Sequence, residues 1–84
     1  MPRFYFDTFD GDHSTTDSDG VDCATMKDVQ DSAVDALPDM AREILPDGPN
    51  RVFRVDVRDG VGQVIFKATL ELKTTWLLDV EDER

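Results

Sequence analysis

The chain has a single cysteine, Cys23, and no apolar run long enough to cross a membrane. One cysteine cannot form an internal disulfide, so the core of this 84-residue chain has to hold without one. The opening residues, MPRFYFD, lack the apolar segment and the small-residue cleavage site of a secretory signal. These absences predict a cytoplasmic protein that does not bind a membrane.

Basic residues are also scarce, because nine Lys and Arg stand against nineteen Asp and Glu, for a net charge of −10. The imbalance lies mainly in residues 1–39, which carry ten aspartates against Arg3 and Lys27. A surface of this sign repels phosphates and therefore argues against direct binding of nucleic acid or of an anionic membrane. Two uses for the charge remain: keeping a small domain in solution, or attracting a basic protein surface.

The composition suffices for one folded domain over residues 1–84, since 39% of the residues are hydrophobic. Alternation of apolar and polar residues predicts strands over residues 3–9, 52–58 and 63–72. Apolar residues recur every three or four positions from Met26 onward, which predicts a helix. They are Met26, Val29, Ala33, Ala36, Leu37, Met40 and Ile44.

Thr25 is the predicted N-cap of this helix, and Asp28, three residues later, completes a weak capping box. Pro38 removes one backbone donor, but the apolar positions stay in phase across it. The sequence therefore predicts one helix with a kink near Pro38, which ends in the proline- and glycine-rich residues 46–50.

The turn residues 59–62 join the last two strands into a hairpin. Pairing Arg58 with Gln63 sets Val57 opposite Val64 and places both apolar faces on one side. The last strand is the longest and most apolar, so the sequence predicts it in the centre of the sheet. The predicted fold is α+β, in the order strand–helix–strand–strand, with the helix packed on a three-stranded antiparallel sheet of order 1-3-2.

The last predicted strand turns five apolar side chains toward the helix. They are Val64, Phe66, Ala68, Leu70 and Leu72. We expect Phe66 and Leu70 to lie beneath Leu37 and Met40. Truncating Phe66 to alanine would then cost about 3–5 kcal/mol of unfolding free energy.

Residues 9–20 form a loop rich in Gly, Ser and Thr with four aspartates, Asp10, Asp12, Asp17 and Asp19. If Asp10 opened an EF-hand-type calcium loop, the obligatory glycine would fall on Thr15 and the bidentate glutamate on Val21. Both decisive positions fail, and a phosphate cradle is disfavoured because the carboxylates would repel the ligand. We expect a hydrated connection that binds no metal and no cofactor.

A thiol enzyme is the remaining catalytic alternative. Cys23 lies just before the predicted helix N-terminus, and His13 is the one histidine. Nearby acids disfavour a thiolate, and neither an oxyanion-hole motif nor a third orienting group is recognisable. The sequence therefore predicts no catalytic residue, and we expect the protein not to be an enzyme.

The candidate interaction residues are Asp28, Asp31, Asp35, Asp39, Tyr5, Ile65, Trp76 and Leu78. The four aspartates form a stripe on the helix, opposite its apolar side, where a basic partner could bind. Tyr5 and Ile65 lie on the sheet face that turns away from the helix. Trp76 and Leu78 belong to a tail, residues 74–84, that lengthens the last strand, folds back or pairs with another chain. Of these, pairing in a two-fold homodimer is favoured.

A family of short bacterial proteins, common in rhizobia and their relatives, resembles this chain in four segments: MPRFYFDTFDGD, DSDGVD, MAREILPDG and VFRVDVRDGVGQVIFKATLEL. The resemblance runs from Met1 to about Leu72, while Pro38 and the Trp-bearing tail depart from the family pattern. The family is catalogued as a domain of unknown function and brings no activity, cofactor or catalytic residue. The resemblance implies a stand-alone bacterial domain with this fold.

A looser pattern is similar to HicB-type antitoxins, in which a strand, a DG-containing loop, a Thr cap and an Ala-rich helix occur in this order. The matching helix reads TMKDVQDSAVDAL. Such antitoxins usually add a DNA-binding module, for which 84 residues leave no room. The sequence predicts a small non-enzymatic protein-interaction module that binds a protein partner or itself. The alternative is an acidic antitoxin- or inhibitor-like protein that covers a basic surface of its partner.

Overall fold

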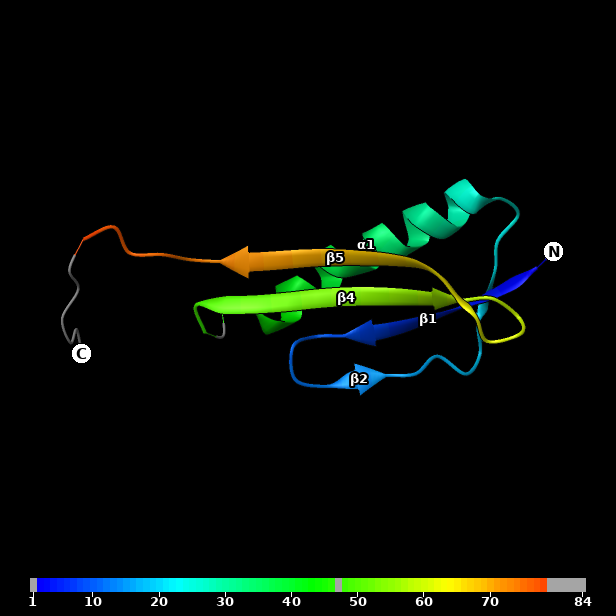
Figure 1. The fold of residues 1–84 in the computed structure, drawn as a ribbon, viewed down its shortest axis with the longest axis horizontal. Helices are drawn as coiled ribbons and strands as arrows, with labels where there is room; N and C mark the ends of the chain where they lie inside the picture. The colour runs from blue at the N-terminus through cyan, green and yellow to red at the C-terminus, as the bar shows by residue number, and fades with distance from the viewer. Residues whose placement is uncertain (1, 47, 79–84) are drawn as a thin grey trace.

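A computed structural model of the chain describes residues 2–46 and 48–78. In this part the elements are β1 (Arg3–Phe9), β2 (Ser14–Thr15), β3 (Val21–Asp22), α1 (Met26–Ile44), β4 (Asn50–Arg58) and β5 (Val64–Lys73). The strands form one antiparallel sheet of order β2-β1-β4-β5, and β3 also pairs with β1. The helix covers one face of this sheet (Figure 1). The predicted α+β class, with one helix on an antiparallel sheet, is confirmed.

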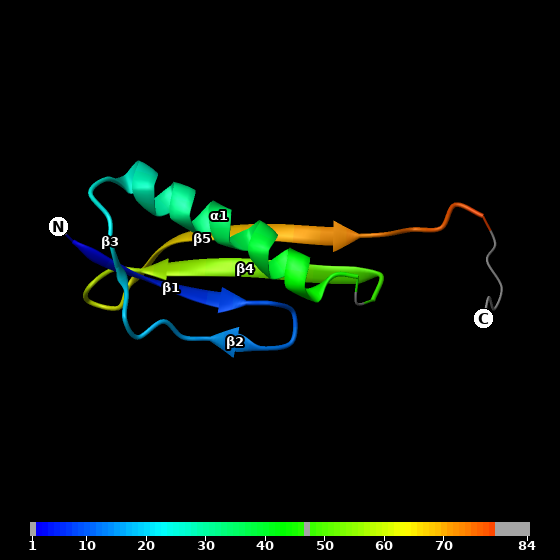
Figure 2. The ribbon, with the colours of Figure 1, turned by 180° about the vertical axis from the view of Figure 1, so that it is seen from behind.

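The three predicted strands are present as β1, β4 and β5, but the predicted number and order of strands are wrong, because β4 rather than the last strand lies in the centre, and β2 and β3 add to the sheet. The prediction assumed that residues 10–24 lead directly from the end of β1 to the helix. Instead they run back along β1, pairing with its end through β2 and with its beginning through β3. The helix therefore starts beside the beginning of β1, and β4 returns antiparallel to β1 (Figure 2).

Helix α1 begins as predicted, since the Asp28 N–H donates to Thr25 Oγ1 at 3.1 Å. It continues unbroken through Pro38, so the prediction of one helix rather than two is confirmed. Pro38 is exposed, which leaves the carbonyl of Val34, without its usual donor, on the side that water reaches.

The β4–β5 register differs from the predicted one. Val57 pairs with Phe66, whereas Arg58 pairs with Val64, so Ile65 is an extra residue that forms a β-bulge. The predicted pairing of Val57 with Val64 is therefore wrong by two residues. Because side chains alternate with a period of two, this shift leaves the predicted faces unchanged from Phe66 onward, whereas Val64, predicted to face the helix, pairs with Arg58.

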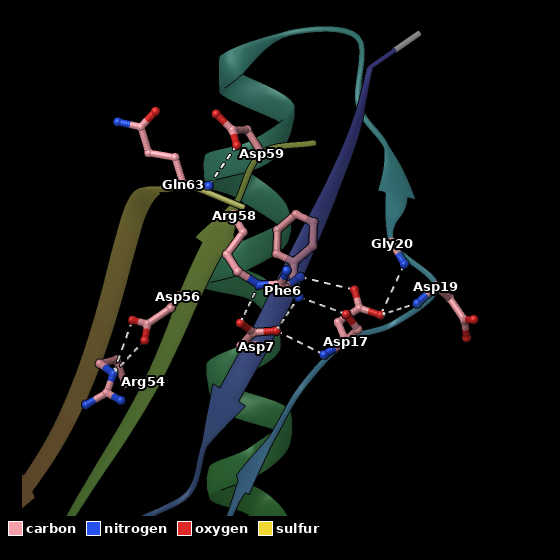
Figure 3. A network of polar contacts seen from close by, with 10 residues as sticks. All are labelled: Phe6, Asp7, Asp17, Asp19, Gly20, Arg54, Asp56, Arg58, Asp59 and Gln63. Atoms are coloured by element: carbon pink, nitrogen blue, oxygen red, sulfur yellow. Dashed lines mark hydrogen bonds and ion pairs between the residues drawn. The ribbon is translucent and has the colours of Figure 1, made fainter. Parts of the chain in front are cut away.

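The turn explains the shift. The Asp59 N–H donates to the Gln63 carbonyl at 2.9 Å, and Asp59 Oδ1 accepts from the Gln63 N–H at 2.9 Å (Figure 3). Asp59 Oδ1 also accepts from the Val61 N–H. Gln63 therefore belongs to the turn, and the predicted pairing of Arg58 with Gln63 is replaced.

The core lies between α1 and the centre of the sheet. Its buried side chains are Phe4, Cys23, Val29, Ala33, Leu37, Phe53, Val55 and Val57. Phe53 is the largest of the fully buried ones. Phe66 only packs against the border of this core, and Leu70 is 40% exposed. The expected position of Leu70 beneath the helix is wrong, because β5 is an edge strand and α1 lies mainly over β4.

Candidate functional site

Asp17 fastens the acidic loop, residues 10–24, to the sheet. Its Oδ2 accepts from the Phe6 N–H at 3.0 Å, and its Oδ1 accepts from the N–H groups of Asp19 and Gly20 at 3.0 and 3.1 Å (Figure 3). Phe6 lies between the part of β1 that pairs with β3 and the part that pairs with β2. The carboxylate therefore takes the place of a backbone carbonyl and closes the gap between the two short strands.

Arg58 ties this loop to the outer face of the sheet, the face turned away from α1. Its Nε and Nη2 donate to the two carboxylate oxygens of Asp7 at 2.7 and 3.1 Å. Its Nη2 also donates to the Asp17 carbonyl at 2.9 Å, while Asp7 Oδ1 accepts from the Asp17 N–H. The guanidinium lies 5.1 Å from the ring centre of Tyr5. Tyr5, a predicted interaction residue, is thus half-buried and already contacts Arg58.

These contacts stabilise the ionised carboxylates. The hydrogen bonds from Arg58 are the main cause that holds the pKa of Asp7 below its usual value. For Asp17, the lowered pKa comes first from the backbone hydrogen bond of Phe6. The hydrogen bonds to Asp7 correspondingly raise the pKa of Arg58. Both carboxylates already serve as acceptors, and nowhere in residues 2–46 and 48–78 do three His, Cys, Asp or Glu gather to hold a metal.

Two further arginines hold the loop at its ends. Arg51 Nε donates to the Asp10 carbonyl at 2.8 Å, and its Nη2 contacts Asp12 Oδ2 at 3.1 Å. Near the other end of the loop, Arg3 Nη1 donates to the backbone carbonyl of Asp19. Asp10 Oδ1 accepts from the N–H groups of Asp12 and His13, and these hydrogen bonds lower the pKa of Asp10. The loop expected to be a hydrated connection is therefore exposed but held in place by the sheet.

The rest of the outer face is covered by paired charges. Arg54 Nε contacts both oxygens of Asp56, at 3.1 and 3.3 Å (Figure 3). Its guanidinium lies 5.0 Å from the ring centre of Phe9. Lys67 of β5 is the register partner of Asp56. Ile65, the second residue predicted on this face, is exposed at the β-bulge. Arg54 and Arg58 thus form ion pairs on the outer face, and Ile65 is exposed at its border.

The two edges of the sheet differ. Along β1, the edge is covered by β2, β3 and the Asp17 carboxylate. Along β5, the outer edge has no partner within the described residues. β5 is also the longest strand of the sheet, with ten residues. A long unpaired edge presents a row of backbone donors and acceptors to which another strand can bind.

The tail adds apolar surface beyond this edge. Thr74 is still attached to the start of β4, because its Oγ1 donates to the Pro49 carbonyl at 2.8 Å. Beyond it, Trp76, Leu77 and Leu78 are 76%, 96% and 66% exposed, and the chain leaves the sheet (Figure 1). Over residues 76–78 the tail neither lengthens β5 nor packs on its own domain. The remaining tail residues lie outside the described part of the chain.

Comparison with models of protein families identifies the family of this chain. The model of a domain of unknown function, DUF6894, matches residues 3–71. The chain belongs to this family. Comparison with curated proteins and with solved structures gave no match. The resemblance to a family of unknown function is confirmed, and the match contains the acidic loop and most of β5 but ends before the tail.

In this DUF6894 member, Cys23 and His13 do not meet. Cys23 follows β3, which pairs with the beginning of β1, whereas His13 precedes β2, which pairs with the end of β1. The two residues therefore lie at opposite ends of β1, roughly 20 Å apart for a strand of this length. Cys23 is buried, and this burial is the main cause that raises the pKa of its thiol.

We expect the Cys23 thiol to react slowly with iodoacetamide in the folded protein, because its burial disfavours the thiolate. The acids Asp28 and Asp22 nearby raise the pKa further. Mass spectrometry after timed alkylation, with and without urea, measures the difference. Alkylation of the native chain at the urea-unfolded rate would contradict the buried position.

The predicted helix stripe consists of Asp28, Asp31, Asp35 and Asp39, all of them exposed. Two of these carboxylates have partners on the helix itself. Lys27 Nζ lies 3.0 Å from Asp31 Oδ2, and Arg42 Nη1 lies 2.7 Å from Asp39 Oδ1. The stripe is therefore partly neutralised within the chain.

No helix among the described residues is long and apolar enough to cross a membrane.

Proposed function

We propose that this chain is a small non-enzymatic protein-interaction module, which acts in the cytoplasm and binds an extended segment of a protein along the free edge of β5. The observation that carries the proposal is the contrast between the two edges of the sheet. The β1 edge is occupied by β2, β3 and Asp17, while the β5 edge is unpaired over the described residues. In such binding, backbone hydrogen bonds supply affinity and the alternating side chains supply specificity.

Exposed apolar side chains flank the same edge. On the helix side of β5, Leu70 is 40% exposed, although its register partner Phe53 is fully buried. Trp76 and Leu77 lie three and four residues after the end of the strand and are exposed. A strand added to β5 would cover this apolar surface, which is a favourable contribution that the isolated chain lacks.

The charge distribution supports a protein partner at this edge. The acidic loop lies along β1, at the edge of the sheet opposite to β5 (Figure 2). β5 itself carries Lys67 and Lys73 against a single acid, Glu71. A partner at β5 therefore approaches the least acidic edge of a chain whose net charge is −10. The lone unpaired Cys23 fits the reducing cytoplasm.

The alternative function, an acidic antitoxin- or inhibitor-like protein, would use the helix stripe to cover a basic surface. The stripe is exposed, but Lys27 and Arg42 already pair with Asp31 and Asp39. Surface pairs of this kind weaken the field that a basic partner would meet. The free edge of β5 is therefore the better supported surface.

Cross-linking with a lysine-specific reagent distinguishes the two surfaces. The chain has three lysines, of which Lys27 lies on α1 while Lys67 and Lys73 lie on β5. We expect a bound protein to be linked through Lys67 or Lys73. Links to a basic partner through Lys27 alone would contradict the proposal and support the alternative.

A pair of matched variants tests the same point. Leu70→Asp places a charge on the helix side of the free edge and is expected to lower the linking yield at least tenfold. Val21→Asp is the control, because Val21 is 47% exposed on β3, at the opposite edge of the sheet, and the same charge there leaves the β5 edge intact. Circular dichroism verifies that both variants fold. Equal yields for both would contradict binding at the edge.

A further inference from the structure

We infer that the strand bound at the β5 edge is β5 of a second copy of this chain, antiparallel to the first and centred on Thr69. This inference rests on the proposed function and names its partner. Two identical strands that pair around a two-fold axis place residues opposite each other whose numbers have a constant sum. The side chains of β5 select one such register.

The apolar face of β5 restricts the choice first. Phe66, Ala68, Leu70 and Leu72 alternate with polar residues and share the face that packs toward α1. A register centred on a residue keeps this face continuous across both copies, with both helices on one side. A register centred between two residues would set the apolar face of one copy beside the charged face of the other.

Charge selects among the remaining registers. With Thr69 opposite Thr69 of the second copy, Lys67 faces Glu71, and by symmetry Glu71 faces Lys67. Each dimer thus gains two cross-strand pairs of opposite charge. Centring the pairing on Leu70 instead would set Lys67 opposite Lys73, which is unfavourable. Centring it on Ala68 would leave Lys67 and Glu71 without opposite charges.

The same register sets apolar side chains opposite one another on the helix side. Phe66 faces Leu72, and Ala68 faces Leu70, whose side chain is 40% exposed in the isolated chain. The second copy would cover Leu70 from the side that α1 leaves open. Removing the exposed part of Leu70 from water would favour association of the two copies.

Continued past Lys73, this register sets the tail beside the β4–β5 turn of the second copy. The strand register ends at the β-bulge of Ile65, so the tail and the turn meet there as segments and not as paired strand positions. Leu77 in the tail and Val61 in the turn are 96% and 88% exposed in the isolated chain. The exposed tail and the exposed turn therefore cover each other.

Cysteine substitution tests the register directly. Opposite residues of antiparallel strands have Cα atoms about 4.5–5.5 Å apart, which lies within the range of a disulfide, about 4.4–6.8 Å. Thr69→Cys is therefore expected to give a disulfide-linked dimer under mild oxidation, seen by non-reducing electrophoresis and intact mass. The parent chain is the control, because its Cys23 is buried.

Two further variants fix the pairing. Lys67→Cys alone should not cross-link, because its two copies lie four positions apart along the strands, about 14 Å. Lys67→Cys mixed with Glu71→Cys should link, since these positions face each other. Sedimentation equilibrium of the parent chain, at micromolar concentration, is expected to show a dimer with Trp76 fluorescence shifted to the blue relative to dilute protein.

The outcomes separate this inference from the proposed function. A dimer that does not cross-link through Thr69→Cys, or that links through Lys67→Cys alone, overturns the register. A monomer at all concentrations overturns self-pairing. In that case the lysine cross-links to another protein still decide, on their own, whether the β5 edge is the interaction surface.

Discussion

Replacing Phe53 by alanine is expected to lower the free energy of unfolding by about 3–5 kcal/mol. The ring is the largest fully buried side chain and lies on the central strand, beneath α1. Small domains are stable by only about 5–15 kcal/mol, so this loss is a large part of the total. Urea unfolding followed by circular dichroism measures it.

Phe66→Ala is the matched control, because it removes the same ring one strand further out. Phe66 is half-buried at the border of the core, so its truncation is expected to cost clearly less than that of Phe53. Both variants are compared at concentrations at which the chain is monomeric. A cost for Phe66 equal to that for Phe53 would contradict the position of β5 at the edge of the sheet.

Replacing Asp17 by asparagine is expected to lower the free energy of unfolding by about 1–2 kcal/mol at neutral pH. The two carboxylate oxygens accept from three backbone N–H groups. An amide offers one oxygen and would turn its NH₂ group toward a donor, either that of Phe6 or that of Gly20. Asp19→Asn is the control, because it removes the same charge nearby without removing an acceptor of this network.

The effect of Asp17 should depend on pH. Its pKa is lowered in the folded chain, so its contribution to stability is present above the unfolded pKa and is lost as the pH falls through the folded value. The stability difference between the parent and Asp17→Asn should therefore be constant above about pH 5, shrink as the pH falls below the unfolded pKa of about 3.9, and be lost below the folded pKa. A difference that persists unchanged in acid would contradict the role of the ionised carboxylate.

The helix and the strand faces could be predicted because their signals are local. Thr25 caps the helix by accepting a hydrogen bond from the N–H of Asp28, three residues later. The spacing of Val29, Ala33 and Leu37 defines the buried side of the helix. Period-two alternation likewise placed Phe53 on the inner face of its strand. These features depend on neighbouring residues, which a single sequence displays directly.

The sheet order could not be predicted because it depends on contacts between distant segments. Residues 10–24 return along β1 because Asp17 reaches Phe6, and because Arg58, 41 residues further on, binds the Asp17 carbonyl. No residue spacing in the sequence indicates that residues 10–24 pair with β1. The register was missed for a more local reason: Gln63 is held by Asp59 in a longer turn, and Ile65 forms a bulge.

The interaction role of the candidate residues stays a prediction, and the free edge of β5 was not foreseen. Trp76 and Leu78 were expected to pack against their own domain or against another chain, and the structure of the single chain leaves both exposed. Tyr5 was expected in the open, whereas the guanidinium of Arg58 lies over its ring. The free edge was missed because the last strand was placed in the centre, although its two lysines are typical of an edge strand.

Amide hydrogen exchange, read residue by residue by NMR at low and high protein concentration, tests the central claim of one closed and one open edge. The N–H of Phe6 should be protected at every concentration, because Asp17 accepts its hydrogen bond. Of the amides in β5, those that point outward should exchange fast in dilute protein and become protected as the concentration rises. Protection of all β5 amides in dilute protein, or fast exchange at Phe6, would contradict the account.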